Sequence, residues 1–157
     1  MQIYFDNAAT TYPKPQEVYE AVNYFQRQVG VNPGRGTYQK SREAEQIIYN
    51  TRAALASLFN IADCSRIVFT SNVTESINLA LKGYLKKGSH VITTAMEHNA
   101  VWRPLKMLEQ RGDIALSLLK CPSGLAFNPA ELSDLIKKNT AMVVINHASN
   151  VTGTIMP

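Results

Sequence analysis

The chain changes from an apolar run to a helix start within Ile67-Val68-Phe69-Thr70-Ser71-Asn72-Val73-Thr74-Glu75. The first residues of this stretch are β-branched and aromatic, which is typical of a strand, and we expect a strand at 66–70. Asn72 can cap the helix that follows, and Glu75 can accept a hydrogen bond from the backbone N–H of that cap. The stretch therefore predicts a turn from a strand into a well-defined helix.

The same helix start is a candidate anion site. Val73 and Thr74 occupy its first turn, where backbone N–H groups have no partner within the helix and the positive end of the helix dipole lies. The Thr74 hydroxyl adds a side-chain donor. The dipole contributes only about 0.3 to 1 kcal/mol, so a binding site needs several N–H donors and further groups. Taken alone, the stretch fits an ordinary capped helix better than a site.

The rest of the chain alternates helices and strands. Apolar residues at helical spacing predict helices at 16–28 and 44–60, with a loop rich in Gly and Pro at 30–36. Repeated β-α units with continuous apolar strands then indicate an α/β fold, with a mostly parallel sheet and helices on both faces. These units consist of strands at 90–94, 114–119 and 142–146, and of helices at 74–86, at 99–111 and from 129 onward.

Polar clusters follow three of the predicted strands, at 71–75, 97–99 and 147–153. Because ligands of open α/β sheets bind beyond the carboxyl ends of the strands, these clusters are candidates for one shared site. A flat anionic cofactor would suit them, with phosphate at Thr74, an aromatic ring near His98 and a polar contact at Asn150. Taken singly, His98 fits a solvated residue at a helix start, and Asn150 fits a turn former.

Composition excludes several classes of protein. The 157 residues are 45% hydrophobic and 18% charged, which fits one globular domain or part of one. The longest aliphatic run, 141–145, is too short to cross a membrane, and the start of the chain has no secretory signal, so we expect a cytoplasmic protein. The net charge of +4 is not gathered into a basic stripe with aromatic residues, so nucleic-acid binding is not expected.

The cysteines and histidines do not form a recognisable site in the sequence. Cys64 and Cys121 lie far apart, and the three histidines are isolated from one another, so we expect no metal. Both cysteines also lie outside the three polar clusters. Neither is therefore a good candidate for a catalytic thiol.

The chain resembles the class V aminotransferase family of pyridoxal phosphate enzymes, and within it the cysteine desulfurase and selenocysteine lyase type. The resemblance runs essentially from end to end, and it implies the N-terminal part of a fold-type I transferase large domain, with an incomplete sheet. Five motifs in order carry it: Tyr4-Phe5-Asp6-Asn7-Ala8-Ala9-Thr10-Thr11, Asn32-Pro33-Gly34-Arg35-Gly36, Val68-Phe69-Thr70-Ser71-Asn72-Val73-Thr74-Glu75-Ser76-Ile77-Asn78, Glu97-His98-Asn99 and Ser149-Asn150-Val151-Thr152-Gly153.

The resemblance also implies roles for individual residues. Val73 and Thr74 would hold the phosphate of pyridoxal 5′-phosphate, His98 would stack on its ring, and Asn150 would contact the side of its phenolic oxygen. The loop at 32–35 looks like the family's substrate-side loop near a dimer interface. The residues expected on the substrate side are Asn7, Ala8, Asn32 and Arg35.

The resemblance places the family's Schiff-base lysine and nucleophilic cysteine beyond the counterpart of Pro157. No lysine here is a credible substitute, because Lys86, Lys87, Lys137 and Lys138 are expected on exposed helix ends. The chain covers well under half of the family's usual length and is expected to be inactive alone. We divide it into an N-terminal helix and active-site loop segment, 1–40, and the start of the cofactor-binding large domain, 41–157.

The parent enzyme is expected to convert L-cysteine to L-alanine and an enzyme persulfide, as a homodimer that serves a sulfur-acceptor protein. Two alternatives stay open: another class V chemistry, such as transamination or selenocysteine cleavage, and a non-catalytic phosphate-binding or interaction remnant. If the sheet is incomplete, the strand at 66–70 stands apart from the other three. The isolated chain is then expected to recruit a partner, swap or aggregate.

Overall fold

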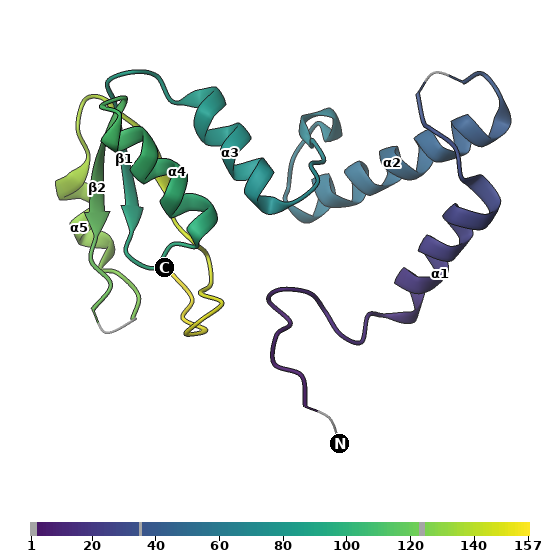
Figure 1. The fold of residues 1–157 in the computed structure, drawn as a ribbon, viewed down its shortest axis with the longest axis horizontal. Coiled ribbons are helices and arrows are strands. Elements are labelled where there is room, and N and C mark those ends of the chain that lie inside the picture. Colours follow the sequence, from purple (N-terminus) through teal and green to yellow (C-terminus); the bar gives the residue numbers. More distant parts are fainter. Residues whose placement is uncertain (1–2, 35, 123–124) are drawn as a thin grey trace. The chain divides into compact units, whose positions relative to one another are not determined.

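The computed structural model describes residues 3–34, 36–122 and 125–157. Contacts divide the chain into two compact units, Met1–Val68 and Phe69–Pro157. The first unit is helical and the second contains a sheet (Figure 1). The expected division after residue 40 concerns the domains of a whole enzyme, and it stays a prediction.

The helical unit contains the two helices predicted at 16–28 and 44–60. Helix α1 (Gln16–Tyr24) continues into a π-helical turn, η1 (Phe25–Val29). Gly30 ends this turn with a left-handed φ of 56°, and its N–H donates to the Phe25 carbonyl at 2.7 Å. Helix α2 (Gln39–Leu58) begins earlier than predicted, and a 3₁₀ turn, η2 (Cys64–Arg66), follows it.

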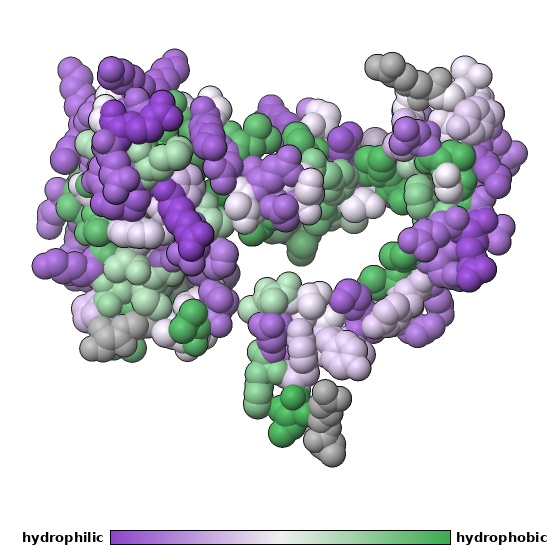
Figure 2. All heavy atoms as spheres, in the orientation of Figure 1, coloured by the Kyte–Doolittle hydropathy of each residue, from purple (hydrophilic) through white to green (hydrophobic). Residues whose placement is uncertain are grey.

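Many large apolar side chains of the helical unit are exposed. Figure 2 shows apolar residues among polar ones at its surface. At the end of α2, Leu58 is 73% exposed and Phe59 is 66% exposed, while the buried residues of α2 are the small Ser41, Ala44 and Ala56. This unit therefore buries little apolar area, which is the main source of stability in a fold.

The prediction of a strand at 66–70 is wrong. The 3₁₀ turn η2 covers Arg66, and residues 67–70 form no strand in the part of the chain that the structure describes. A strand needs a neighbour with which to exchange backbone hydrogen bonds, and the three strands of the sheet pair only with one another. Val68 remains 67% exposed. The local β pattern alone was not sufficient to form a strand.

The sheet unit follows the predicted order of helices and strands. Its sheet has the strand order β2-β1-β3, and both pairings are parallel, as predicted. The elements are α3 (Val73–Tyr84), β1 (Ser89–Thr94), α4 (Asn99–Gln110), β2 (Ile114–Leu119), α5 (Pro129–Leu135) and β3 (Thr140–Val144).

Two hydrophobic clusters cover the two faces of the sheet, which confirms the prediction of helices on both faces. On one face, Val91 of β1 packs with Leu81 of α3 and Leu105 of α4. On the other face, the adjacent Ile92 packs with Leu119 of β2 and with residues of α5 and the C-terminal segment. Successive residues of a strand point to opposite faces, so Val91 and Ile92 anchor one cluster each.

His90 links all three strands with polar contacts. Its ring is fully buried on the central strand β1. Nδ1 lies 2.8 Å from the Thr140 hydroxyl on β3, and Nε2 lies 2.8 Å from the Ser117 hydroxyl on β2. Both ring nitrogens therefore have partners, as buried polar atoms require.

Candidate active site

The start of α3 has the predicted capping arrangement. The Asn72 side chain accepts a hydrogen bond from the Glu75 N–H at 2.9 Å. Glu75 accepts in return from the N–H of Ser71 at 2.9 Å, one residue before the cap that the sequence pattern suggested. Hydrogen bonds from Ser71 lower the pKa of the Glu75 carboxyl. A charged carboxylate thus holds the turn that precedes α3.

The N–H groups of Val73 and Thr74 are available to a ligand. Among the residues that the structure describes, none accepts a hydrogen bond from either group. Val73 is 66% exposed, and Thr74 is also exposed. Two adjacent donors at the positive end of a 12-residue helix, with the Thr74 hydroxyl beside them, form an arrangement that suits a phosphate.

A cavity of about 400 Å³ connects the start of α3 with the start of α4. Helix α3 contributes Thr74 and Lys82 to its lining, and α4 contributes Asn99 and Arg103. The lysine and the arginine give this cavity a positive character, which favours an anion. Neither residue could be identified from the sequence, because neither belongs to a motif and only the packing of α3 against α4 brings them together.

His98 caps α4 with its side chain. Nδ1 of the exposed ring accepts a hydrogen bond from the Ala100 N–H at 3.1 Å. Because Nδ1 is the acceptor, the neutral ring has its proton on Nε2, the nitrogen on the far side of the ring. The cap fixes the orientation of the imidazole next to Asn99, which lines the cavity. His98 thus lies at the helix start that the sequence indicated.

Asn150 lies in a closely hydrogen-bonded loop after β3. Buried Ser149 holds this loop, because its hydroxyl accepts from the N–H of Val151 at 3.3 Å and from the N–H of Thr152 at 3.2 Å. Asn150 itself is exposed. The loop begins where β3 ends, and β3 pairs with β1, whose own end leads to His98. The fold therefore brings the His98 and Asn150 segments to one edge of the sheet.

The residues expected on the substrate side belong to the helical unit. Asn7 accepts from the Tyr12 N–H at 3.2 Å and holds an exposed turn that includes Ala8. The Asn32 carbonyl accepts from the Ser41 hydroxyl at 3.3 Å. Arg35 lies outside the described residues. The structure places Asn7, Ala8 and Asn32 within this unit only, so their role toward a substrate stays a prediction.

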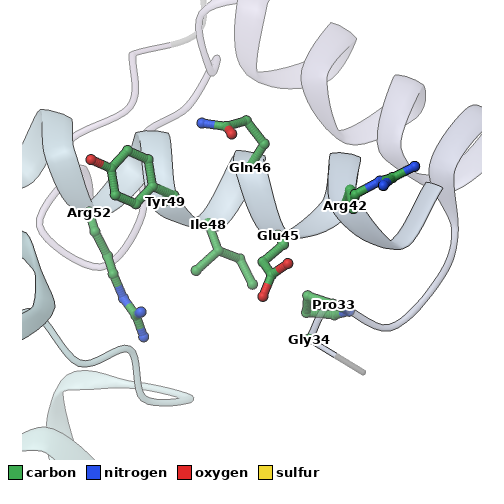
Figure 3. A pocket seen from close by; sticks show the side chains of 8 residues that line it. All are labelled: Pro33, Gly34, Arg42, Glu45, Gln46, Ile48, Tyr49 and Arg52. Carbon is green, nitrogen blue, oxygen red and sulfur yellow. The ribbon is translucent and has the colours of Figure 1, made fainter. Parts of the chain in front are cut away.

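A second cavity, of about 650 Å³, lies between the loop at Pro33 and Gly34 and one side of α2. Figure 3 shows Glu45, Ile48 and Arg52 leaving α2 on the side of these two loop residues. Arg42 and Tyr49 complete much of its lining. Charged groups of both signs thus lie beside the predicted substrate-side loop.

The reactive groups of the described residues do not converge on a catalytic centre. Lys86, Lys87, Lys137 and Lys138 are exposed, as predicted, although they follow α3 and α5 rather than ending them. Cys64 and Cys121 are half-buried free thiols. Within the described ranges, no three metal-binding side chains gather, and no helix is long and apolar enough to cross a membrane.

The family model "Aminotransferase class-V" matches residues 3–157. The chain belongs to the class V aminotransferase family. It is 36% identical over 160 residues to the cysteine desulfurase IscS of Dictyoglomus turgidum, which covers 99% of this chain and 40% of that protein. A probable cysteine desulfurase of Methanothermobacter thermautotrophicus is 31% identical over 154 residues, covering 98% of this chain and 38% of that protein.

Solved structures agree with this membership of class V. A NifS-like protein superposes with a TM-score of 0.87 at 32% identity, over 100% of this chain and 43% of its own. A structure described as SspA in complex with cysteine superposes with a TM-score of 0.86 at 32% identity, over 99% of this chain and 45% of its own. The class V chain thus spans about 40% of the length of the curated relatives that it matches, and the part matched is their N-terminal part.

Proposed function

We propose that the chain supplies the phosphate-binding and ring-stacking residues of a cysteine desulfurase that depends on pyridoxal 5′-phosphate. The observation that carries this proposal is a pair of unsatisfied N–H groups at the start of α3, in a chain whose relatives are named cysteine desulfurases over nearly its whole length. A helix start with a cap but no ligand would have the same two free N–H groups, which would then bind water. The family and the donors together favour a phosphate.

The donors present fit the phosphate group of the cofactor. The N–H groups of Val73 and Thr74 and the Thr74 hydroxyl offer three hydrogen-bond donors, and Lys82 and Arg103 add positive charge to the adjoining cavity. A hydrogen bond to a charged group contributes about 1.5 to 3 kcal/mol, roughly twice the typical bond between neutral groups. Several such bonds would hold a phosphate firmly.

His98 and Asn150 would orient the ring. The cap to Ala100 holds the imidazole in one orientation, and an aromatic stack contributes about 0.5 to 1.5 kcal/mol beyond buried area. Asn150 would contact the side of the phenolic oxygen from the loop that Ser149 orders. When bound, pyridoxal phosphate supplies the electron sink for the substrate's carbon centre, so the residues of this chain serve to bind and orient.

The proposed substrate is L-cysteine, which leaves as L-alanine after its sulfur has passed to an enzyme thiol. One similar solved structure is described as a complex with cysteine. Asn7, Ala8, Asn32 and Arg35 are proposed on the substrate side. We further propose a homodimer that passes sulfur to an acceptor protein, in the cytoplasm, where thiols are kept reduced.

Amide NMR spectra recorded during titration test the proposal. Pyridoxamine 5′-phosphate is a suitable probe, because it has the phosphate and the ring but no aldehyde that would react with lysines. We expect it to shift the Val73, Thr74 and His98 signals together, and Thr74→Val to weaken binding by about 1.5 to 3 kcal/mol. Thr51→Val, which changes a threonine on α2 in the other unit, is the matched control.

Two results would count against the proposal. If no amide of the first turn of α3 shifts at saturating probe, the helix start is only capped. If inorganic phosphate binds as tightly as pyridoxamine 5′-phosphate and the His98 signals do not move, the site recognises phosphate without the ring, which favours the non-catalytic alternative.

A further inference from the structure

Glu97 connects the ends of two strands that lead to the proposed cofactor-binding residues. Its Oε1 accepts a hydrogen bond from the Thr94 hydroxyl at 2.8 Å, at the end of β1. The same oxygen accepts from the backbone N–H of Asn146 at 2.8 Å, just after β3. The half-buried carboxylate of Glu97 thus hydrogen-bonds to a residue 49 positions away in the sequence.

The contact with Thr94 also orders the turn that leads to His98. Thr94 is fully buried, and its hydroxyl oxygen accepts from the Met96 N–H at 3.2 Å while its proton goes to Glu97. The Thr94 hydroxyl therefore stabilises the turn with two hydrogen bonds, one to the Glu97 carboxylate and one from the Met96 N–H. His98 follows Glu97 directly and caps α4, so its position depends on this turn.

The contact with Asn146 fixes the start of the segment 146–150, which contains Asn150. Asn146 leads through His147 and Ala148 to buried Ser149, whose hydroxyl and backbone groups order the loop around Asn150. Asn146 is half-buried, and a hydrogen bond from its N–H to a carboxylate is stronger than one to a neutral acceptor, so its loss is expected to have a clear local effect. Among the described residues, no other side chain accepts a hydrogen bond from this N–H.

We propose that Glu97 is a positioning residue that holds the His98 turn and the 146–150 segment in a fixed relation to each other. This inference rests on the proposed function, in which His98 and Asn150 contact the same cofactor ring. The carboxylate does not touch the cofactor in this proposal. It acts by keeping two contacts, which arise from different strands, at the spacing that one rigid ring requires.

Hydrogen exchange of the full chain without any ligand tests the positioning role. Glu97→Ala is expected to speed exchange of the Asn146 amide by roughly 10- to 100-fold, the loss expected for a hydrogen bond to a charged group. Exchange of the Met96 amide, which donates to the Thr94 hydroxyl, is expected to become faster as well. Core amides of Ile92 and Leu105 are expected to change less than the two segments. Glu97→Gln keeps an oxygen that can accept both bonds, so it is expected to restore most of the protection.

Glu131→Ala is the matched control, because it removes an exposed carboxylate from α5 of the same unit. Thr94→Val, which removes one donor while keeping the shape of the side chain, is the second variant if Glu97→Ala does not fold. It is expected to speed exchange of the Met96 amide, whose acceptor is the Thr94 hydroxyl. Unchanged exchange at both segments would overturn the inference, as would equal acceleration in the core or no rescue by glutamine.

Titration with pyridoxamine 5′-phosphate separates this inference from the proposed function. If the wild-type chain shows no ligand shifts but Glu97→Ala frees both segments, the link between the strand ends stands and the proposed function fails. If the wild type binds the probe, Glu97→Ala is expected to weaken binding about 10-fold or more, while Glu131→Ala leaves it unchanged. Wild-type affinity in Glu97→Ala would overturn the positioning role.

Discussion

Buried His90 is expected to make the stability of the sheet unit depend on pH. Burial, followed by the charge of Lys137, lowers the pKa of its ring below the ordinary value of about 6.5. The unfolded chain then binds a proton more readily than the folded chain. The stability due to His90 is therefore complete above about pH 6.5 and is lost as pH falls toward the pKa of the folded state.

The physical cause of this loss is the burial of charge rather than the loss of hydrogen bonds. In the neutral ring one nitrogen donates and the other accepts, and the Ser117 and Thr140 hydroxyls can take either role. A protonated ring can donate to both. What changes on protonation is that a full charge lies in the middle of a sheet, near the cation of Lys137.

Denaturant unfolding at several pH values measures the effect. We compare wild type with His90→Gln, which cannot titrate but can keep polar contacts, and with His147→Gln, which changes an exposed histidine. Between about pH 7.5 and about pH 5, wild type and His147→Gln are expected to lose stability, and His90→Gln is expected to lose less. Lys137→Met is expected to reduce the dependence of stability on pH in part, because it removes a charge that disfavours the protonated His90 ring.

The cost of removing the ring follows from its contacts. His90→Leu abolishes two side-chain hydrogen bonds, each of about 0.5 to 1.5 kcal/mol, so we expect a loss of about 1 to 3 kcal/mol at neutral pH. Equal slopes of stability against pH in His90→Gln and wild type would refute the reasoning. So would a stability of the wild type that rises as the pH falls through this range.

Three further predictions concern packing and chemistry. Gly36→Ala is expected to lower the melting temperature, because a Cβ there would lie 2.7 Å from the Ser41 Cβ, whereas Gly83→Ala, with open space around it, is expected to be neutral or stabilising. In denaturant unfolding, Leu105→Ala is expected to cost about 2 to 5 kcal/mol and exposed Leu79→Ala far less. Borohydride reduction with pyridoxal phosphate, followed by peptide mapping, is expected to give no single stoichiometric pyridoxyl-lysine on this chain.

Local chemistry predicted the helices well. Asn72 and Asn128 both cap the helices that the sequence placed after them, because a short side-chain oxygen at this position reaches an N–H of the first turn. The cap by His98 was not predicted, since histidine is not among the usual N-cap residues. Its ring nitrogen fills the same role by a geometry that only the folded backbone defines.

Contacts between segments distant in sequence could not be predicted in the same way. The links of Glu97 to Asn146 and of His90 to Thr140 depend on the strand order β2-β1-β3 and on its register. The order of elements predicted a parallel sheet but not which strand would be central. The cavity with Lys82 and Arg103 likewise depends on how α3 packs on α4.

In the stretch at 66–75, one element is determined by local contacts and the other would require tertiary contacts. The helix start at its end forms as predicted because every bond of its cap comes from within the stretch, between Ser71, Asn72 and Glu75. The strand at its beginning does not form because a strand requires backbone partners from elsewhere. The N–H groups of Val73 and Thr74, which are proposed to bind phosphate, depend only on this locally determined helix start. The proposed cofactor site therefore does not require that residues 66–70 join the sheet, and the Thr74→Val titration tests the site independently of that pairing.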